Sequence, residues 1–252
     1  MSGSRLLFEM TRRRFFAPPS AFNFSRQNVT LTADEARHLR EVLRLKPGDE
    51  VSVFDGEGKE FRARVAQARR ESAELDLEEE IEPARPESPL QLTLAVALLK
   101  GEKFDLVVQK ATELGVTKII PLVTRYADIK LRDDSDASKR VARWQRIALE
   151  AAKQCGRAVV PKIDDPVAFE SVLNPSNLCL LFTERGGHGL TQIDTDVVTA
   201  IVGSEGGWSD EELDQARAAG AQLVTLGGRI LRAETAAITA AALLQHRFGD
   251  LK

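Results

Sequence analysis

Two glycine-rich loops carry the residue types in this chain that could do chemistry. The first loop, 203–207, reads Gly-Ser-Glu-Gly-Gly and directly follows an apolar run that ends in Ile201 and Val202. The second loop begins with Gly227, Gly228 and Arg229 after the apolar run 223–226. Apolar runs of this length that end in glycine are typical of buried parallel strands followed by loops. Because ligands of open α/β sheets bind beyond the carboxyl ends of the strands, the two loops predict one ligand site at one rim of a sheet.

The chemistry of the first loop argues against a polyphosphate ligand. The sequence GSEGGW does not match GxGxxG, and the chain contains no GxxxxGK[ST] pattern. Glu205 would repel phosphate groups, whereas it suits a ligand with hydroxyl, amino or positively charged groups. Just beyond the loop, Ser209 and Glu212 have the spacing of a capping box and predict the start of a helix. The alternative is that both loops are tight turns and that Glu205 is an exposed acid.

Composition and length indicate an ordinary soluble protein with one large or two ordinary domains. The chain has 252 residues, of which 43% are hydrophobic and 29% charged. Its apolar runs are too short to span a bilayer, and residues 1–14 lack the apolar stretch of a signal peptide, so we expect a cytoplasmic location. Cys155 and Cys179 lie too far apart for a CxxC site and the histidines are scattered, so no metal site is expected.

Positive charge is concentrated at the amino-terminal end of the chain. The formal net charge is −3, so the protein as a whole is not basic. Residues 1–70, however, carry fourteen lysines and arginines against nine acids, and acids then cluster in 71–82. This asymmetry favours an RNA-facing amino-terminal region, with ordinary surface charge as the alternative.

Two arginine clusters in this region could contact RNA. Three consecutive arginines precede Phe15 and Phe16, and arginines beside aromatic rings can bind phosphates and stack on bases. The alternative is a solvated triplet followed by two core phenylalanines. The second cluster lies on a helix expected at 33–43, where the spacing gives one basic stripe. The candidate RNA-binding residues are therefore Arg12, Arg13, Arg14, Arg37, Arg40 and Arg44.

The order of expected elements divides the chain into two parts. Strands expected at 28–31, 51–54, 60–70 and 73–80 surround one helix, which Thr32 caps with Glu35 at its third position. Short strands with one helix suggest a small barrel. Pro83, Pro86 and Pro89 then mark a linker. Beyond it, strands at 92–98, 118–123, 159–163, 178–182, 197–202 and 222–226 alternate with helices at 103–114, 138–155, 166–173, 210–219 and 234–248. This alternation predicts an α/β domain with a parallel sheet and helices on both faces.

Specific motifs give the chain a family resemblance. GSEGGWSDEE at 203–212 and LGGRILRAETA at 226–236 strongly resemble the RsmE-type 16S ribosomal RNA (uracil-N3) methyltransferases of the SPOUT superfamily, and the segments 100–103, 113–115 and 150–157 match as well. The resemblance spans residues 12 to about 249. It implies a flexible arm at 1–11, a PUA-like RNA-binding β-barrel at 12–82, a linker at 83–89, and a SPOUT-type parallel-sheet domain with a carboxyl-terminal trefoil knot at 90–252.

The resemblance also implies a reaction and its participants. Members of this family use S-adenosylmethionine to methylate N3 of a uridine in 16S ribosomal RNA, which makes the small ribosomal subunit the expected partner and a homodimer without metal the expected assembly. It adds Arg157 and Arg229 to the candidate RNA-binding residues. The cofactor site that it implies comprises Leu181, Thr183, Gly203, Glu205, Gly206, Leu226, Gly227, Ile230, Leu231 and Ala236.

Methylation at uracil N3 requires help with a proton. N3 holds its proton at neutral pH, so the enzyme must remove it or stabilise the anion. Arg232 could stabilise negative charge on a uracil carbonyl, and Glu234 is the nearby carboxylate that could act as base. Glu234 could equally be an acid placed at the positive end of a helix. Two rival functions remain: methylation of another nucleotide, and a non-catalytic role in RNA binding or ribosome assembly.

Overall fold

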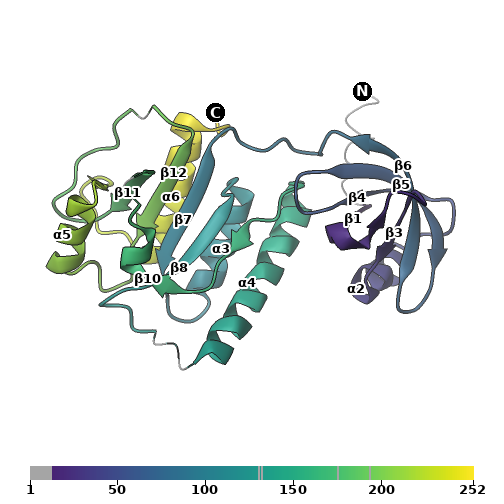
Figure 1. Cartoon of the computed structure of the whole chain (residues 1–252), viewed down its shortest axis with the longest axis horizontal. Coiled ribbons are helices and arrows are strands. Elements are labelled where there is room, and N and C mark those ends of the chain that lie inside the picture. The colour runs from purple at the N-terminus through teal and green to yellow at the C-terminus, as the bar shows by residue number, and fades with distance from the viewer. Residues whose placement is uncertain (1–12, 130, 132, 175, 193) are drawn as a thin grey trace. The chain divides into compact units, whose positions relative to one another are not determined.

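The protein is described by a computed structural model that covers residues 13–129, 131, 133–174, 176–192 and 194–252. Its contacts divide the chain into two compact units. The first unit comprises the chain up to Glu87 together with Ala152–Val160, and the second comprises Ser88–Ala151 and Pro161–Lys252. Figure 1 shows the chain, and each unit is described by itself.

The first unit is built on a six-stranded sheet with the order β1-β4-β5-β6-β3-β2. All of its neighbours are antiparallel except β1 and β4. Alternating apolar residues such as Val51, Val53, Ala63 and Val65 are buried in one core with the helical segment. This sheet stands where the sequence predicts a small barrel. The strands are β1 (Arg14–Phe16), β2 (Phe22–Asn23), β3 (Asn28–Leu31), β4 (Glu50–Phe54), β5 (Glu60–Ala68) and β6 (Ala73–Ile81).

The helical segment of the first unit differs from the regular helix expected at 33–43. Helix α2 (Ala33–Arg37) continues as a π-helical turn, η2 (His38–Val42). The wider turn rotates the later side chains, and Val42 is 64% exposed. The Thr32 side chain makes no capping hydrogen bond. Glu35 is instead buried, and it accepts a hydrogen bond of 2.6 Å from Lys153.

A buried ion network connects residues 152–160 to the sheet of the first unit. Arg14 donates to both carboxylate oxygens of Glu60, at 2.9 and 3.1 Å, and to the carbonyl oxygen of Arg157 at 2.8 Å. Arg157 in turn pairs with Glu87 at 2.6 Å. Arg14 is 4% exposed and Arg157 is 5% exposed. Both were predicted to bind RNA, but in this structure both guanidinium groups bind carboxylates in the interior and are closed to an RNA phosphate.

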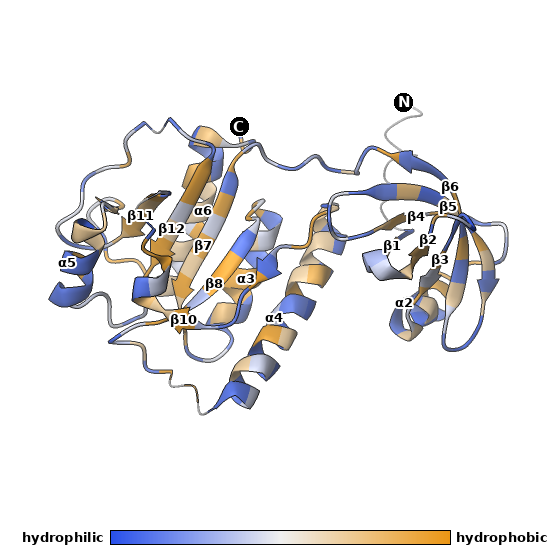
Figure 2. Cartoon of the chain, in the orientation of Figure 1, coloured by the Kyte–Doolittle hydropathy of each residue, from blue (hydrophilic) through white to orange (hydrophobic). Residues whose placement is uncertain are grey.

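The second unit contains a parallel sheet with the order β10-β8-β7-β12-β11-β13, and β9 also pairs with β8. Every strand pairing in it is parallel, as predicted. Figure 2 shows the apolar character of its strands, which is typical of strands covered on both faces. The strands are β7 (Gln91–Ala97), β8 (Lys118–Val123), β9 (Lys162–Ile163), β10 (Val167–Ala168), β11 (Leu178–Phe182), β12 (Val197–Val202) and β13 (Gln222–Val224).

The helices of the second unit largely match the expected ranges. They are α3 (Lys103–Glu113), α4 (Asp134–Cys155, which ends in the first unit), α5 (Asp210–Ala218) and α6 (Ala233–Phe248). Helix α6 packs on α3, β7 and β12, whereas α5 contributes Leu213 to the core that contains Leu181 and Ile201. The helix expected at 166–173 is wrong. Strand β10 and the 3-10 turn Phe169–Val172 occupy this stretch, because its two buried apolar side chains are three residues apart.

Parallel pairing brings the carboxyl ends of four strands to one edge of the sheet. Phe182 at the end of β11 lies in register with Val202 at the end of β12 and with Val224 at the end of β13. Val202 is also in register with Val96 near the end of β7. The segments that follow these strands therefore begin side by side, although they are distant in the sequence.

We predict that Glu60→Gln destabilises the first unit, because the substitution leaves the buried Arg14 charge without its counterion. Breaking a buried ion pair in this way costs about 3 kcal/mol or more. Glu80→Gln is the matched control, since Glu80 pairs with Lys59 at 3.8 Å on the surface and such pairs contribute at most about 1 kcal/mol. Chemical denaturation followed by circular dichroism measures both variants, and equal effects would contradict a stabilising role of the buried pair.

Candidate functional site

A cavity of about 600 Å³ lies at this edge of the parallel sheet, within the second unit. Its walls come from the segments after β11, β12 and β13, with Lys103 at the start of α3 and Ala236 in α6. A cavity of this size is typical of sites for drug-sized ligands. The two glycine-rich loops identified in the sequence therefore line one site, as their positions after parallel strands predict.

Most of the predicted cofactor-binding residues line this cavity. The exception is Leu181, which is fully buried in the core beneath the loops and does not reach the cavity. Ile230 lines the cavity but is 86% exposed, so it lies at the rim. The predicted residues that line the cavity are Thr183, Gly203, Glu205, Gly206, Leu226, Gly227, Ile230, Leu231 and Ala236.

Packing within the protein explains two glycines of the first loop. A Cβ atom on Gly203 would lie 3.0 Å from the Trp208 ring, and one on Gly206 would lie 2.6 Å from the Cβ of Tyr126 and 2.9 Å from its carbonyl oxygen. Trp208 is itself buried and donates a hydrogen bond of 2.9 Å to the carbonyl oxygen of Phe182. The loop thus needs glycine in order to fold closely over its own neighbours. The family resemblance placed Gly203 and Gly206 in the cofactor site, and nothing in the sequence singled out Trp208.

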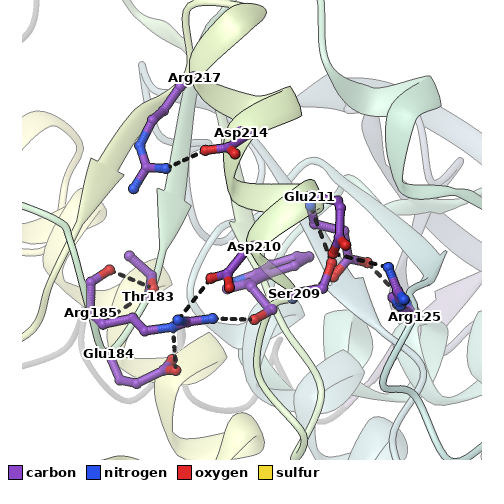
Figure 3. Close-up of polar contacts among 11 residues, drawn as sticks. Arg125, Thr183, Glu184, Arg185, Ser209, Asp210, Glu211, Asp214 and Arg217 are labelled. Atoms are coloured by element: carbon purple, nitrogen blue, oxygen red, sulfur yellow. Dashed lines mark hydrogen bonds and ion pairs between the residues drawn. The ribbon is translucent and has the colours of Figure 1, made fainter.

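Polar contacts hold the far end of the first loop (Figure 3). The Ser209 hydroxyl accepts from the backbone N–H of Glu212, and the Glu212 carboxylate accepts from the backbone N–H of Ser209, so the predicted capping box is confirmed. Arg185, after β11, donates to the carbonyl oxygen of Trp208 at 2.9 Å. The backbone N–H of Arg125, after β8, donates to Glu212 at 2.9 Å. Segments that follow two other strands, β8 and β11, therefore fix the start of α5 and the loop before it.

A lysine between two carboxylates dominates the electrostatics of the cavity. Lys103 Nζ lies 2.7 Å from Glu205 Oε1 and 3.8 Å from Glu234 Oε2. Partial burial by itself would raise the pKa of Glu205. The hydrogen bond from Lys103, the backbone hydrogen bonds at residues 205 and 100 and the lysine's charge outweigh that effect, so the pKa lies below its usual value. Sequence analysis gave Lys103 no role, although it belongs to the motif at 100–103.

Several buried polar atoms at the site have no hydrogen-bond partner among the described residues. They are Ser204 Oγ, Thr225 Oγ1 and Glu234 Oε2. Ser204 and Thr225 line the cavity. Buried polar groups are normally paired because leaving them unpaired costs about 1–3 kcal/mol each. These atoms therefore suit a polar ligand that supplies the missing hydrogen bonds.

The two arginines of the second loop stand at the cavity with their side chains exposed. Arg229 and Arg232 both line the cavity. Arg232 is the residue that precedes α6, and its side chain does not cap the helix. Glu234 follows in the first turn of α6 with 13% of its side chain exposed. Arg232 and Glu234, the two residues predicted to act on the acceptor uracil, therefore both lie at the amino-terminal end of α6.

The candidate RNA-binding arginines of the first unit that remain accessible lie on its surface. Arg13 and Arg44 are exposed, Arg37 lies 3.4 Å from Asp34, and Arg40 lies 2.6 Å from Glu41. Arg12 and residues 1–11 lie outside the described residues. In the described part of the chain, no helix has the length and apolar content to cross a membrane, and no cluster of His, Cys, Asp and Glu side chains is arranged to hold a metal ion.

Two family models match the chain. The model of an RNA methyltransferase domain matches residues 86–245, and the model of an RNA methyltransferase PUA domain matches residues 31–78. The first covers more than half of the chain and contains every segment that lines the cavity. The second falls within the six-stranded sheet and helical segment of the first unit.

Individual relatives agree with these models. The chain is 37% identical to the ribosomal RNA small subunit methyltransferase E of Synechocystis sp., over 93% of this chain and 77% of the relative. It is 34% identical to the protein of the same name from Rickettsia conorii, over 85% and 88% of the two chains.

Solved structures of RNA methyltransferases are similar to this chain as well. The crystal structure of ribosomal RNA small subunit methyltransferase E from Neisseria gonorrhoeae, bound to S-adenosylmethionine, is 36% identical with a TM-score of 0.85 and covers 95% of this chain and 99% of that one. A putative methyltransferase from Legionella pneumophila, also in complex with S-adenosylmethionine, is 33% identical with a TM-score of 0.85, over 95% and 99%. The chain therefore belongs to the ribosomal RNA small subunit methyltransferase E family of RNA methyltransferases.

Proposed function

We propose that this chain methylates N3 of a uridine in 16S ribosomal RNA and uses S-adenosylmethionine as the methyl donor. The observation that carries the proposal is the cavity itself. Three loops after parallel strands enclose it, and it is lined by the carboxylates of Glu184 and Glu205 and by two hydroxyl groups without a hydrogen-bond partner among the described residues. The fold matches relatives solved with S-adenosylmethionine. The small-subunit RNA as substrate is supported by the names of the relatives.

The residues around the cavity fit S-adenosylmethionine. The molecule has a flat adenine, two ribose hydroxyls, an amino-acid portion and a positively charged sulfonium, and when bound it supplies an electrophilic methyl group. Leu226 and Leu231 offer apolar surface for the adenine. The unpaired hydroxyls of Ser204 and Thr225 can bond polar groups of the ligand. Glu205 supplies negative charge opposite the cationic groups.

The acceptor side of the reaction falls to residues at the start of α6. The Glu234 carboxylate accepts the N3 proton of uracil, and its buried Oε2 atom, which accepts no hydrogen bond from the described residues, supports this role. The lone pair of N3 then forms the new N–C bond to the methyl group, and the sulfur keeps the electrons of the bond that breaks. Arg232, exposed at the cavity, donates to a uracil carbonyl oxygen and stabilises the negative charge there.

We also infer the trefoil knot in the second unit. Backbone hydrogen bonds of 2.9 Å join His188 to Leu223 and Thr225. A Cβ on Gly187 would lie 2.6 Å from the Thr225 hydroxyl, so the loop after β11 and the segment around β13 cross in close contact. A tight crossing of this kind, followed by a helix whose buried face is rich in alanine, is what a threaded chain end requires.

The remaining organisation follows from the family. We infer a PUA-like RNA-binding barrel at 12–82, a linker at 83–89 and the methyltransferase domain at 90–252, acting in the cytoplasm as a homodimer. The exposed arginines Arg13, Arg37 and Arg44 and the half-buried Arg40 support RNA contact by the barrel, and Arg229 supports contact at the cavity.

The proposed reaction predicts one labelled product. Unmodified small ribosomal subunits are incubated with the protein and with S-adenosylmethionine labelled in the methyl group, and the RNA is digested to nucleosides for mass spectrometry. We expect label in 3-methyluridine. Label in another nucleoside would overturn the uridine-N3 assignment, and cofactor binding without any transfer to RNA would favour the non-catalytic role.

We predict that Gly206→Ala weakens S-adenosylmethionine binding about tenfold or more, because the added Cβ would clash with the Tyr126 backbone and displace the first loop. Gly189→Ala is the matched control, since a Cβ there has nothing within 4 Å. Isothermal titration calorimetry measures both affinities. Unchanged binding by Gly206→Ala would remove this loop from the cofactor site.

We predict that Arg232→Ala lowers kcat about a hundredfold, the effect of removing one donor to a developing oxyanion, and changes cofactor affinity little. Arg217→Ala serves as control, because Arg217 pairs with Asp214 on the exposed face of α5. Single-turnover methylation and calorimetry separate the two effects. A loss of cofactor binding that matches the loss of rate would show that Arg232 acts on the cofactor instead.

A further inference from the structure

We propose that Lys103 is a further catalytic residue of this reaction. In this proposal its ammonium group donates a hydrogen bond to a carbonyl oxygen of the target uracil and stabilises the negative charge that develops there when N3 loses its proton. Glu205 is then a positioning residue that holds Lys103, rather than a direct contact to the cofactor. The proposal rests on the proposed function, because it concerns the acceptor of the same reaction.

The place of Lys103 in the fold supports a role beyond surface charge. It is the first residue of α3, which follows β7. The segment after β7 thus lines the cavity together with the segments after β11, β12 and β13. The cationic side chains that line the cavity, within the described residues, are those of Lys103, Arg229 and Arg232. The two arginines are exposed, whereas the Lys103 side chain is 34% exposed. A cation that is less exposed to water stabilises a nearby anion more strongly.

The hydrogen bonds of Lys103 leave it able to contact a substrate. An ammonium group has three N–H donors. Among the described residues, Lys103 makes one side-chain hydrogen bond, to Glu205 at 2.7 Å. Its distance of 3.8 Å to Glu234 Oε2 is an ion pair beyond hydrogen-bond length. A uracil that enters beside Glu234 would therefore meet N–H donors that the protein leaves available.

Glu205 is suited to hold the ammonium group in place. Its carboxylate accepts backbone hydrogen bonds at residues 205 and 100 as well as the bond from Lys103, and its pKa is lowered despite the opposing effect of burial. It therefore stays ionised over the pH range in which the reaction would be measured. A carboxylate fixed by backbone N–H groups defines the position of its lysine more closely than a mobile surface acid would.

The pair Lys103 and Glu234 matches the edge of uracil. That edge presents an N3–H donor flanked by two carbonyl acceptors. Glu234 supplies an acceptor for N3–H, and the ammonium 3.8 Å away supplies a donor for a neighbouring carbonyl oxygen. Cytosine lacks the N3 proton, so it would present an acceptor to the Glu234 carboxylate. The same pair therefore favours uracil over cytosine as the acceptor base.

The step balances in protons and charge. The N3–H bond breaks, its proton passes to a Glu234 oxygen, and its electron pair stays on the ring, delocalised onto the two carbonyl oxygens. Glu234 becomes neutral while the ring becomes anionic, so Lys103 exchanges one anionic neighbour for another. Bond formation between N3 and the methyl carbon then consumes the electron pair and neutralises the ring.

The test compares Lys103→Met, Lys103→Arg and Glu205→Gln with wild type. Lys110→Met is the matched control, because Lys110 lies on the same helix and pairs with Glu113 away from the cavity. We expect Lys103→Met to lower kcat about a hundredfold, as for loss of one oxyanion donor, with cofactor affinity by calorimetry changed no more than about threefold. Lys103→Arg should recover part of the rate. Glu205→Gln should lower kcat, and combining it with Lys103→Met should add little.

A substrate with a more acidic N3 separates charge stabilisation from a structural role. Small subunits are reconstituted with RNA that carries 5-fluorouridine, whose N3 anion is more stable and needs less help. The defect of Lys103→Met should shrink on this substrate, and it should also shrink as the pH rises. A defect that is the same on both substrates, or a loss of cofactor binding, would overturn the proposal. The wild-type product tests the proposed function separately, since wild type must first yield 3-methyluridine.

Discussion

The parallel pairing of the second unit's sheet is the constraint on which the site depends. Parallel strands all end at the same edge, so the segments after β7, β11, β12 and β13 start side by side although more than a hundred residues separate the first from the last. Each segment contributes residues that line the cavity. An antiparallel sheet would send half of these segments to the opposite edge, and no common cavity would form.

Protein packing, more than the absent ligand, sets the shape of the first loop. Gly203 lies against Trp208, Gly206 lies against Tyr126, and hydrogen bonds from Arg185 and Arg125 hold the residues that follow. A loop that is fixed before the ligand arrives loses little conformational entropy on binding. The Ser204 and Thr225 hydroxyl groups, which have no hydrogen-bond partner in the described part of the chain, are then already in place for the ligand. The site is thus preorganised for a polar, compact molecule.

Charge is distributed so that the cavity can hold both a cationic donor and an anionic acceptor. Glu184 and Glu205 line the cavity and supply negative charge, and Glu234 lies beside it at the start of α6. Lys103 lies between Glu205 and Glu234 and offsets their charge. The exposed arginines at the entrance add positive charge where RNA would approach. Separate groups of opposite charge within one cavity suit a reaction that passes a methyl group from a sulfonium to a nitrogen that has just lost a proton.

The sequence predicts well whatever depends on local pattern. Apolar runs located β7, β8, β11, β12 and β13 of the parallel sheet, and the Ser209–Glu212 spacing located the start of α5, because periodicity and capping act over a few residues. The α-helix expected at 33–43 was wrong in its second half, where residues 38–42 form a π-helical turn that no local pattern in the sequence indicates.

Features that depend on distant partners were not visible in the sequence. Arg14 reads as part of a basic triplet, and its burial follows from Glu60, 46 residues later. Leu181 adjoins the site along the chain, yet the alternation of strand side chains turns it into the core. Lys103 lies 102 residues from Glu205, so only the fold reveals that the two meet.

A crystal structure of this protein with S-adenosylmethionine would test the central claim most directly. The account predicts electron density for the ligand between the loops after β11, β12 and β13, with its polar groups bonded to the Ser204 and Thr225 hydroxyls and its methyl group directed towards Glu234. Lys103 should keep its hydrogen bond to Glu205. Density at another location, or a ligand whose methyl group points away from the start of α6, would contradict the assignment of this cavity as the methyl-transfer site.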